Sequence, residues 1–307
     1  MPQRFPTTER EILKASYLPR ICASAALVLT SGISATAHAD QFIGFGQPGT
    51  PGSWAVEAFP VINRSAGGNV RAGANTVLAY FSKTGFTGTT RDQIEVWAGA
   101  IPGYATPVGG SDTAAGIASP NIGLEYYYNV VEPKGEYGSP NYTTFWTSPT
   151  LMIEFPNGNK DVSGFGAGGN RYAYSFSIAN YVQVGKWGMT FTPVGLYYAD
   201  RARNATDMGN GDLRRLRGGL SLWFADIAAG YQVTPSLWLG VHHIYSIFNH
   251  SATDFAESRE GKIGPSLTYT GLSKYGVVIA ANVNFGYYHS ANLPHANSLT
   301  MALVKSF

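Results

Sequence analysis

Apolar and polar residues alternate in blocks of about ten residues along most of the chain after residue 40. Between 276 and 287, for example, Val277, Ile279, Val283 and Phe285 share one parity, while the other is mostly glycine, alanine and asparagine. Successive side chains of a strand point to opposite faces, so a period of two predicts β-strands. Such blocks predict twelve strands, over residues 53–63, 69–83, 91–104, 120–132, 143–155, 170–184, 188–200, 216–232, 235–248, 260–270, 275–288 and 298–307.

The residues that alternate with the apolar positions are mostly Gly, Ala, Ser, Asn and Thr, with very few charges. A strand of a soluble sandwich exposes charged and polar residues on its outer face and packs bulky residues inside. A small, uncharged second face is instead expected inside a barrel whose apolar face meets lipid. Tyrosines gather near strand ends, at 126–128, 197–198 and 287–288. They fit the aromatic girdles of a membrane barrel, although sheet propensity also favours tyrosine.

The connections between the later strands alternate in length. Those at 184–188, 232–236 and 270–276 are short, whereas those at 199–216, 248–262 and 288–298 are longer and polar. Short turns at one end and long loops at the other are typical of outer-membrane barrels. The pattern therefore predicts an all-β fold, a transmembrane antiparallel up-and-down β-barrel of about twelve strands in the bacterial outer membrane. A secreted soluble β-sandwich is the alternative, and the long turn at 132–142 departs from the alternation.

The first 39 residues have the pattern of an export signal. Basic residues precede an apolar stretch from Ile21 to Ile33, and Ala37-His38-Ala39 supplies a small-x-small cleavage pattern. We therefore predict a cleaved signal peptide over residues 1–39 and a single barrel domain over residues 40–307. A membrane anchor is the alternative interpretation, but thirteen apolar residues are short for a transmembrane helix.

Composition agrees with this class of protein. Charged residues make up 13% of the chain, about half of the ~25% usual in soluble domains. Aromatic residues also make up 13%, yet the mean hydropathy is only −0.07, as expected where apolar and small polar residues are mixed. The net charge of +2 comes from four basic and two acidic residues of the leader, so the mature chain is neutral. That balance argues against a nucleic-acid partner.

Apolar residues recur in steps of two up to the last residue, at Leu299, Met301, Leu303 and Phe307. Lys305 interrupts the run, but a lysine at a membrane boundary can extend its amine to water. This ending resembles the C-terminal sorting signal of bacterial outer-membrane proteins. The barrel assembly machinery is therefore a predicted partner.

Several short stretches are similar to one family. They are Ser119–Leu124 before a strand, Phe155–Gly158 at the end of one, Gly169–Tyr172, Gly230–Thr234 at a turn, and Lys262–Pro265. With these stretches the chain resembles the meta-pathway of phenol degradation family of outer-membrane proteins. The family usually has Pro-Thr-Gly where this chain has Pro156-Asn157-Gly158, and Asn-Gly is also a good turn former. The resemblance implies a barrel linked to aromatic degradation that passes hydrophobic substrates, and it supplies no binding residues.

A small set of polar residues falls where the pattern places the barrel lumen. Charges there line a water-filled route or pair with one another, whereas on the lipid face each would cost a few kcal/mol at mid-depth. Internal pairing is the structural alternative to a functional role. Alternation is interrupted within 216–232, so the pattern does not settle the face of the acidic residue in that strand. The lumen-lining candidates are Glu125, Asn129, Asp226, His242, Asn282 and Asn284.

Catalytic and metal chemistry receive little support. His242, His243 and His250 lie on or near one strand with Ser246 and Ser251, and a serine nucleophile needs a base within reach. No stretch carries a signature of known outer-membrane hydrolases, and no carboxylate stands at a metal-ligand spacing. We therefore predict no catalytic residue, no metal site and no cofactor. Arginines cluster in 199–217 with aspartates, which predicts a solvated outer loop, and contact with lipopolysaccharide phosphates is a less favoured addition.

Strand number bears on the function. Eight strands enclose a lumen filled by side chains and sixteen or more leave an aqueous channel, so twelve predict a narrow, partly closed lumen. The expected function is passage of small hydrophobic or aromatic compounds. The alternatives are a structural or adhesive outer-membrane barrel without transport activity and, less favoured, an outer-membrane hydrolase. Predicted partners are outer-membrane lipid and lipopolysaccharide, the barrel assembly machinery and small hydrophobic solutes.

Overall fold

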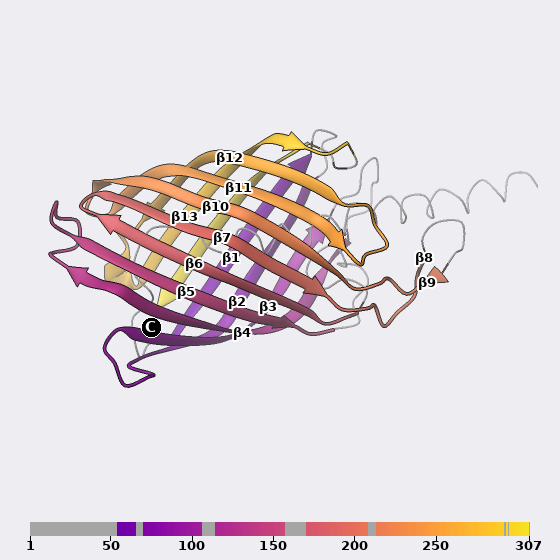
Figure 1. Ribbon diagram of the computed structural model, residues 1–307, viewed down its shortest axis with the longest axis horizontal. Coiled ribbons are helices and arrows are strands. Elements are labelled where there is room, and N and C mark those ends of the chain that lie inside the picture. The colour runs from indigo at the N-terminus through magenta and orange to yellow at the C-terminus, as the bar shows by residue number, and fades with distance from the viewer. Residues whose placement is uncertain are drawn as a thin grey trace, which may run out of the picture.

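A computed structural model describes residues 54–65, 70–105, 114–156, 170–207, 213–291, 293 and 295–306. In this part of the chain twelve strands form one closed antiparallel barrel, in which β1 pairs with β14 (Figure 1). The barrel strands are β1 Trp54–Ser65, β2 Val70–Thr84, β3 Asp92–Ala105, β4 Ala114–Lys134, β5 Thr143–Glu154, β6 Ala173–Val184, β7 Trp187–Ala199, β10 Gly219–Thr234, β11 Leu237–Ser251, β12 Ser258–Tyr269, β13 Val277–His289 and β14 Ala296–Ser306.

Two small elements lie outside the barrel wall. The ribbon of β8 Thr206–Asp207 and β9 Leu213–Arg214 interrupts the connection between β7 and β10, and the 3-10 helix η1 Ser273–Tyr275 lies between β12 and β13. No helix among the described residues is long and apolar enough to cross a membrane. The predicted signal peptide lies outside the described residues.

The predicted up-and-down antiparallel barrel is confirmed, with corrections at strand ends. β4 begins at Ala114, before the predicted start at 120, and β10 begins at Gly219 instead of 216. Residues before Gly219 instead belong to the β7–β10 connection, where the Ala202 backbone N–H donates to the Leu216 carbonyl at 2.9 Å. Strand ends depend on such contacts between distant segments, which an alternating pattern does not contain.

The barrel has two different ends. We call "turn end" the one with the connections 84–92, 134–143, 184–187, 234–237 and 269–277, and "loop end" the one with 65–70, 105–114, 154–173, 199–219, 251–258 and 289–296. Because the barrel has an even number of antiparallel strands, β1 begins and β14 ends at the turn end. The connections that we expected to be short and those that we expected to be long therefore fall at opposite ends.

Large apolar side chains cover the outside of the barrel. Leu151 is 53% exposed, Val241 51% and Phe285 51%, and most strands carry such residues at alternate positions. A continuous apolar surface of this extent is unfavourable in water and calls for lipid around it. Leu299, Met301 and Leu303 of the predicted sorting signal alternate with the buried Ser298, Thr300 and Ala302, and Phe307 lies outside the described residues.

Exposed aromatic rings lie toward both ends of this surface. At the turn end, the rings of Trp187 and Tyr231 meet edge to face with centroids 4.9 Å apart. Toward the loop end, Tyr174 and Tyr198 stack with centroids 6.4 Å apart. Rings with a polar edge favour the two boundaries between lipid and water. The apolar band therefore lies between two aromatic girdles, as in membrane barrels.

The inside of the barrel differs from the expectation of small residues alone. Trp223 is 3% exposed and lies over Gly195, where an added Cβ would come within 1.8 Å of the indole ring. Trp97 lies over Gly123 in the same way, with 1.9 Å for the added Cβ. Glycines on the inner face thus make room for tryptophans of neighbouring strands. Alternation alone did not show this, because each glycine and its tryptophan are joined only by strand pairing.

A β-bulge in β10 explains its interrupted alternation. Ala225 has a φ of 46°, and two residues of β10 oppose one residue of β11 between Phe224 and Ile227. Before the bulge the odd-numbered Trp223 is buried inside, and after it the even-numbered Asp226 is. Bulges re-aim side chains in this way. The bulge therefore turns the Asp226 carboxylate into the lumen.

Candidate functional site

Aromatic side chains fill the lumen near the turn end. Tyr127, Trp146, Tyr181 and Trp238 form one buried cluster with Ala228. The rings of Tyr127 and Trp146 meet edge to face with centroids 5.3 Å apart, and those of Trp146 and Tyr181 lie 5.6 Å apart. Trp146, Tyr181 and Trp238 are at most 1% exposed. These rings come from β4, β5, β6 and β11, so the cluster spans a large part of the inner wall.

The long turn between β4 and β5 lies against this cluster. The Trp238 indole N–H donates to the Tyr137 hydroxyl at 2.9 Å, and burial raises the pKa of that hydroxyl. Gly138 has a φ of 82° and lies beside Gln232, to whose amide nitrogen an added Cβ would be 3.3 Å. Gly185 in turn lies against the Pro140 carbonyl. The turn is long because it reaches from β4 to β10 and β11 and covers the aromatic cluster.

A buried polar group follows the aromatic cluster toward the loop end. His242 Nε2 lies 2.7 Å from the Asp226 carboxylate, and His242 Nδ1 lies 2.8 Å from the Asn284 side-chain oxygen. These residues belong to β10, β11 and β13, and none is more than 5% exposed. Asp226, His242 and Asn284 thus form one hydrogen-bonded group that joins three strands inside the barrel.

Between the aromatic cluster and this group runs one row of paired residues. The Asn282 side chain is fully buried, and neither its oxygen nor its nitrogen has a hydrogen-bond partner among the described residues. The Ser266 hydroxyl, its partner across the strands, is also buried without one. Buried amides and hydroxyls without partners are costly, so these atoms are suited to bind a polar group. The full row is Gly188, Gly230, Gly240, Ser266, Asn282 and Thr300.

Four of the six predicted lumen residues thus lie on one part of the wall, namely Asp226, His242, Asn282 and Asn284. Glu125 and Asn129 are on β4, which lies on a different part of the barrel. Glu125 is paired across the strands with Glu95, and the Ser148 hydroxyl donates to it. Asn129 lies opposite Trp146, and its side-chain oxygen is buried without a partner in the described structure.

Sequence reasoning missed other inward polar residues. Lys262 and Glu260, both on β12, form an ion pair with Nζ and Oε1 2.7 Å apart, and their side chains are at most 8% exposed. Glu95 is 4% exposed and accepts a hydrogen bond from Gln93 at 2.7 Å. Lys262 follows the same parity as the small residues of its strand, so the pattern contained the signal. The alternation around Glu95 was a weaker signal, because its strand belongs to the less regular first half of the chain.

The loop-end half of the lumen holds apolar side chains beside the Glu260–Lys262 ion pair. Tyr197, Trp223 and Ile244 pack with Ala173 and Ala199 in a second buried cluster. Still closer to the loop end, Phe248 contacts Leu293. The described lumen therefore has one aromatic cluster toward the turn end and a second toward the loop end, with buried polar groups between and beside them.

The three histidines predicted near serines contact other groups in the described residues. Both ring nitrogens of His242 contact Asp226 and Asn284, whereas those of His243 contact the Ala225 carbonyl and the Tyr287 hydroxyl. A base for serine activation needs a free ring nitrogen at the hydroxyl. His250 lies in the loop end, 2.7 Å from Glu257. Within the described ranges, no three His, Cys, Asp or Glu residues are placed to hold a metal ion.

Comparison with solved structures gives the same architecture. The chain is similar to an outer membrane channel from Pseudomonas putida F1, with a TM-score of 0.62 and 12% identity over 87% of this chain and 98% of that one. This is a bacterial outer-membrane β-barrel fold. The transport unit of the autotransporter AIDA-I from Escherichia coli is also similar, with a TM-score of 0.51 and 10% identity over 93% of this chain and 99% of that one. No family model and no curated protein matches the sequence.

The fold and the outer surface both indicate the membrane in which the protein resides. A closed barrel with an apolar band between two aromatic girdles requires a bilayer around it. The solved barrels of this architecture are bacterial outer-membrane proteins. The protein is therefore an outer-membrane β-barrel.

Proposed function

We propose that the barrel is a passive route for small hydrophobic or aromatic molecules. The observation that carries the proposal is the aromatic lining of the lumen, above all the cluster of Tyr127, Trp146, Tyr181 and Trp238. Ring faces and edges attract other aromatic rings, with a preferred edge-to-face or offset geometry. A water-filled porin would instead expose polar and charged groups to its channel.

The polar residues fit the same class of solute. The Glu260 carboxylate is in contact with the Lys262 ammonium group, so this pair leaves little field for an ion, and Asp226 is hydrogen-bonded to His242. The unpartnered amide of Asn282 offers an N–H donor group and an oxygen acceptor, in the row of paired residues that adjoins the row of Trp238. A phenol combines a ring with one hydroxyl, and both parts find a counterpart here.

One sequence resemblance and one structural comparison support this proposal. The sequence resembles the meta-pathway of phenol degradation family, and the similar protein from Pseudomonas putida F1 is an outer membrane channel. The lumen is filled by side chains and covered at the turn end by the turn that carries Tyr137. We therefore expect slow passage of single small molecules and poor passage of sugars.

Solute flux into liposomes tests the proposal. Purified protein is reconstituted around an encapsulated reagent that reports the arrival of phenol, and empty liposomes measure diffusion through lipid. We expect phenol to enter faster than in empty liposomes, and faster than a sugar of equal size. Flux equal to that of empty liposomes for every solute would overturn the proposal and favour a structural barrel.

A pair of tryptophan variants makes the test specific to the lumen. Trp238→Ala removes a fully buried inner ring, so the preference for phenol over sugar should fall. Trp187→Ala removes an outer ring that is 68% exposed, so the preference should not change. If both variants alter the preference equally, the inner cluster is not the selective element.

A further inference from the structure

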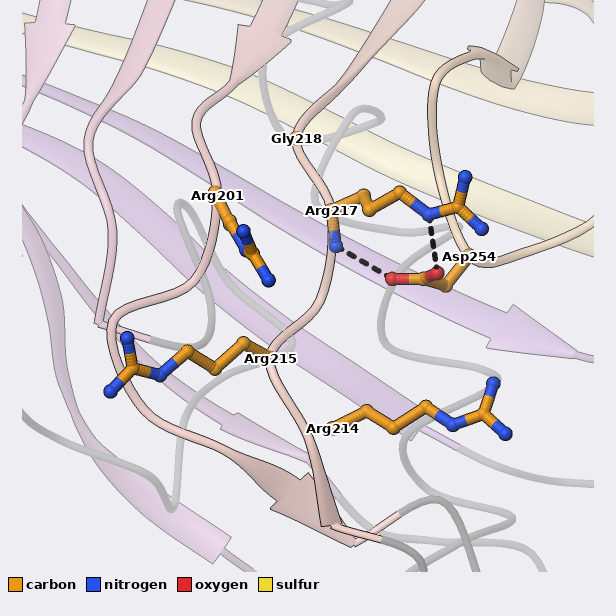
Figure 2. Close-up of a pocket in the computed structure, with 6 residues that line it drawn as sticks. All are labelled: Arg201, Arg214, Arg215, Arg217, Gly218 and Asp254. Atoms are coloured by element: carbon orange, nitrogen blue, oxygen red, sulfur yellow. Dashed lines mark hydrogen bonds and ion pairs between the residues drawn. The ribbon is translucent and has the colours of Figure 1, made fainter.

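Two connections at the loop end form a pocket rich in arginine. Its volume is about 460 Å³, and it is lined by Arg201, Arg214, Arg215, Arg217, Gly218 and Asp254 (Figure 2). The four arginines lie on the two limbs of the β7–β10 connection, whereas Asp254 comes from the β11–β12 connection. The pocket thus combines four arginines of the β7–β10 connection with one carboxylate of the β11–β12 connection.

The carboxylate is already engaged. Arg217 donates to Asp254 from its backbone N–H at 2.6 Å and from its side-chain Nε at 2.9 Å. These hydrogen bonds, with the charges of Arg217 and Arg214, lower the pKa of Asp254, which therefore stays ionised at neutral pH. Four arginines and one carboxylate line the pocket, so its lining keeps a positive excess.

Two of the guanidinium groups have no carboxylate partner among the described residues. Arg201 uses only its backbone N–H, which donates to Asp200, and no ion pair forms at Arg215 within that part of the chain. Both side chains are exposed at the pocket. Guanidinium groups left to water in this way are available to a ligand with oxygen acceptors.

The backbone holds the two limbs close together. A Cβ added at Gly218 would lie 2.6 Å from the Ala199 carbonyl oxygen, so the limbs approach more closely there than a side chain allows. The hydrogen bond from Ala202 to Leu216 ties the same limbs together, and both residues are buried. The fold of the loop therefore brings the arginines of the two limbs to the lining of one pocket.

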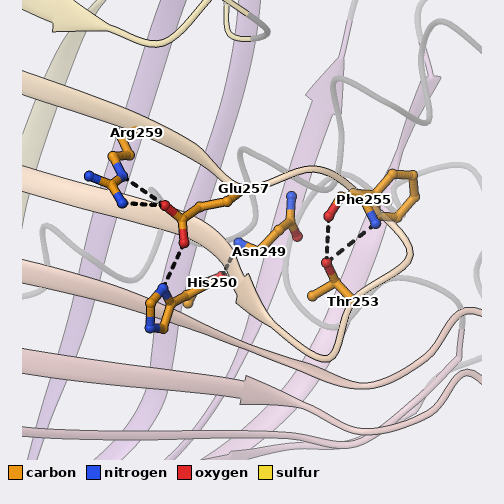
Figure 3. Close-up of polar contacts among 7 residues, drawn as sticks. Asn249, His250, Thr253, Phe255, Glu257 and Arg259 are labelled. Carbon is orange, nitrogen blue, oxygen red and sulfur yellow. Dashed lines mark hydrogen bonds and ion pairs between the residues drawn. The ribbon is translucent and has the colours of Figure 1, made fainter.

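Other arginines near the barrel ends are neutralised differently. Arg259 donates to Glu257, which also contacts His250 (Figure 3). Arg91, at the turn end, pairs with Glu132 at 3.5 Å. These residues are exposed like those of the pocket, but each has its own carboxylate. They serve as matched controls.

We propose that the arginine pocket binds phosphate groups. A guanidinium group presents a planar fork of donors that matches two phosphate oxygens, and several forks around one pocket suit a phosphorylated headgroup. The long loops of outer-membrane barrels are extracellular, so the pocket lies near the phosphates of the outer leaflet. The volume suits a phosphorylated sugar. The same chemistry would accept a free phosphate, and the test separates the two sources.

Binding of fluorescent lipid A to the full-length barrel in detergent tests the proposal. We expect Arg201→Gln with Arg215→Gln to weaken binding about tenfold or more, because charge-assisted hydrogen bonds are lost. The control Arg91→Gln with Arg259→Gln removes the same charge elsewhere and should leave binding unchanged. Mobility of unboiled protein on a gel verifies that each variant is a folded barrel.

A conservative double variant, one competitor and one dephosphorylated ligand complete the design. Arg201→Lys with Arg215→Lys keeps the charge without the fork and should bind with intermediate strength. Displacement of lipid A by millimolar inorganic phosphate would assign the pocket to free phosphate, and arginine-dependent binding without displacement would assign it to the headgroup. The proposal is overturned if dephosphorylated lipid A binds as tightly as lipid A, or if the control variant loses as much as the pocket variant.

Discussion

The loss of stability on substituting an outward-facing residue by arginine tests whether the outer face of the barrel contacts lipid. Ile263 is the sixth of the twelve residues of β12 and is 43% exposed on the outside. Five residues at ~3.3 Å each, on a strand tilted by about 45°, place it about 12 Å above the strand start, near the middle of a ~25 Å apolar band. Ile263→Arg should therefore destabilise the barrel by about 2–4 kcal/mol. Val184, the last residue of β6 and 60% exposed, is the matched position near the boundary, where the same change should cost about 0–1 kcal/mol.

The assay is reversible urea unfolding of the protein in lipid vesicles, followed by tryptophan fluorescence. The informative quantity is the difference between the two variants, because it cancels the effects of the arginine on the unfolded state. A surface substitution in water would change the free energy of unfolding by no more than about 0.5 kcal/mol at either position. Equal small effects at 263 and 184 would therefore refute the lipid-facing assignment of this surface. A larger cost at 184 would place the apolar band at a different height.

Three further predictions concern strain, pH and sidedness. Ala225→Gly should raise the stability by roughly 1 kcal/mol, because Ala225 holds a φ of 46° that glycine adopts freely, and an unchanged urea midpoint would contradict strain at the bulge. Arg217 lowers the pKa of Asp254, so their contact stabilises the loops above the ordinary Asp pKa of about 4 and is lost as pH falls through the lower folded value. Proteolysis of these loops should rise in that acidic range, and Asp254→Asn should abolish the dependence. On intact cells an impermeant thiol reagent should label Ala205→Cys and spare Thr234→Cys, and the reverse result would invert the barrel.

Local alternation determined much of the fold. β13 and β12 each show a clean period of two, and the structure places their apolar parity outside and their small or polar parity inside. Strand number followed from the same signal, because each membrane strand must carry its own apolar face. His242 and Asn282 fell on the inner parity of well-formed strands, so their burial inside the barrel followed without knowledge of any partner.

Other features depend on contacts between strands that are distant in the sequence. Asp226 reaches His242 only because the bulge at Ala225 shifts the parity of β10 by one residue. The length of the turn after β4 is explained only by the folded barrel, in which Trp238 hydrogen-bonds to Tyr137 of that turn, 101 residues away. Strand pairing alone likewise decides which glycine faces which tryptophan.

The sequence by itself therefore determined the barrel, its lipid face and its approximate strand number, since alternation and turn residues act over a few neighbours. Only the tertiary structure decided what fills the lumen and what gathers at its loop end. Those arrangements arise when the sheet closes and brings together side chains whose separation along the chain carries no information about their distance in space.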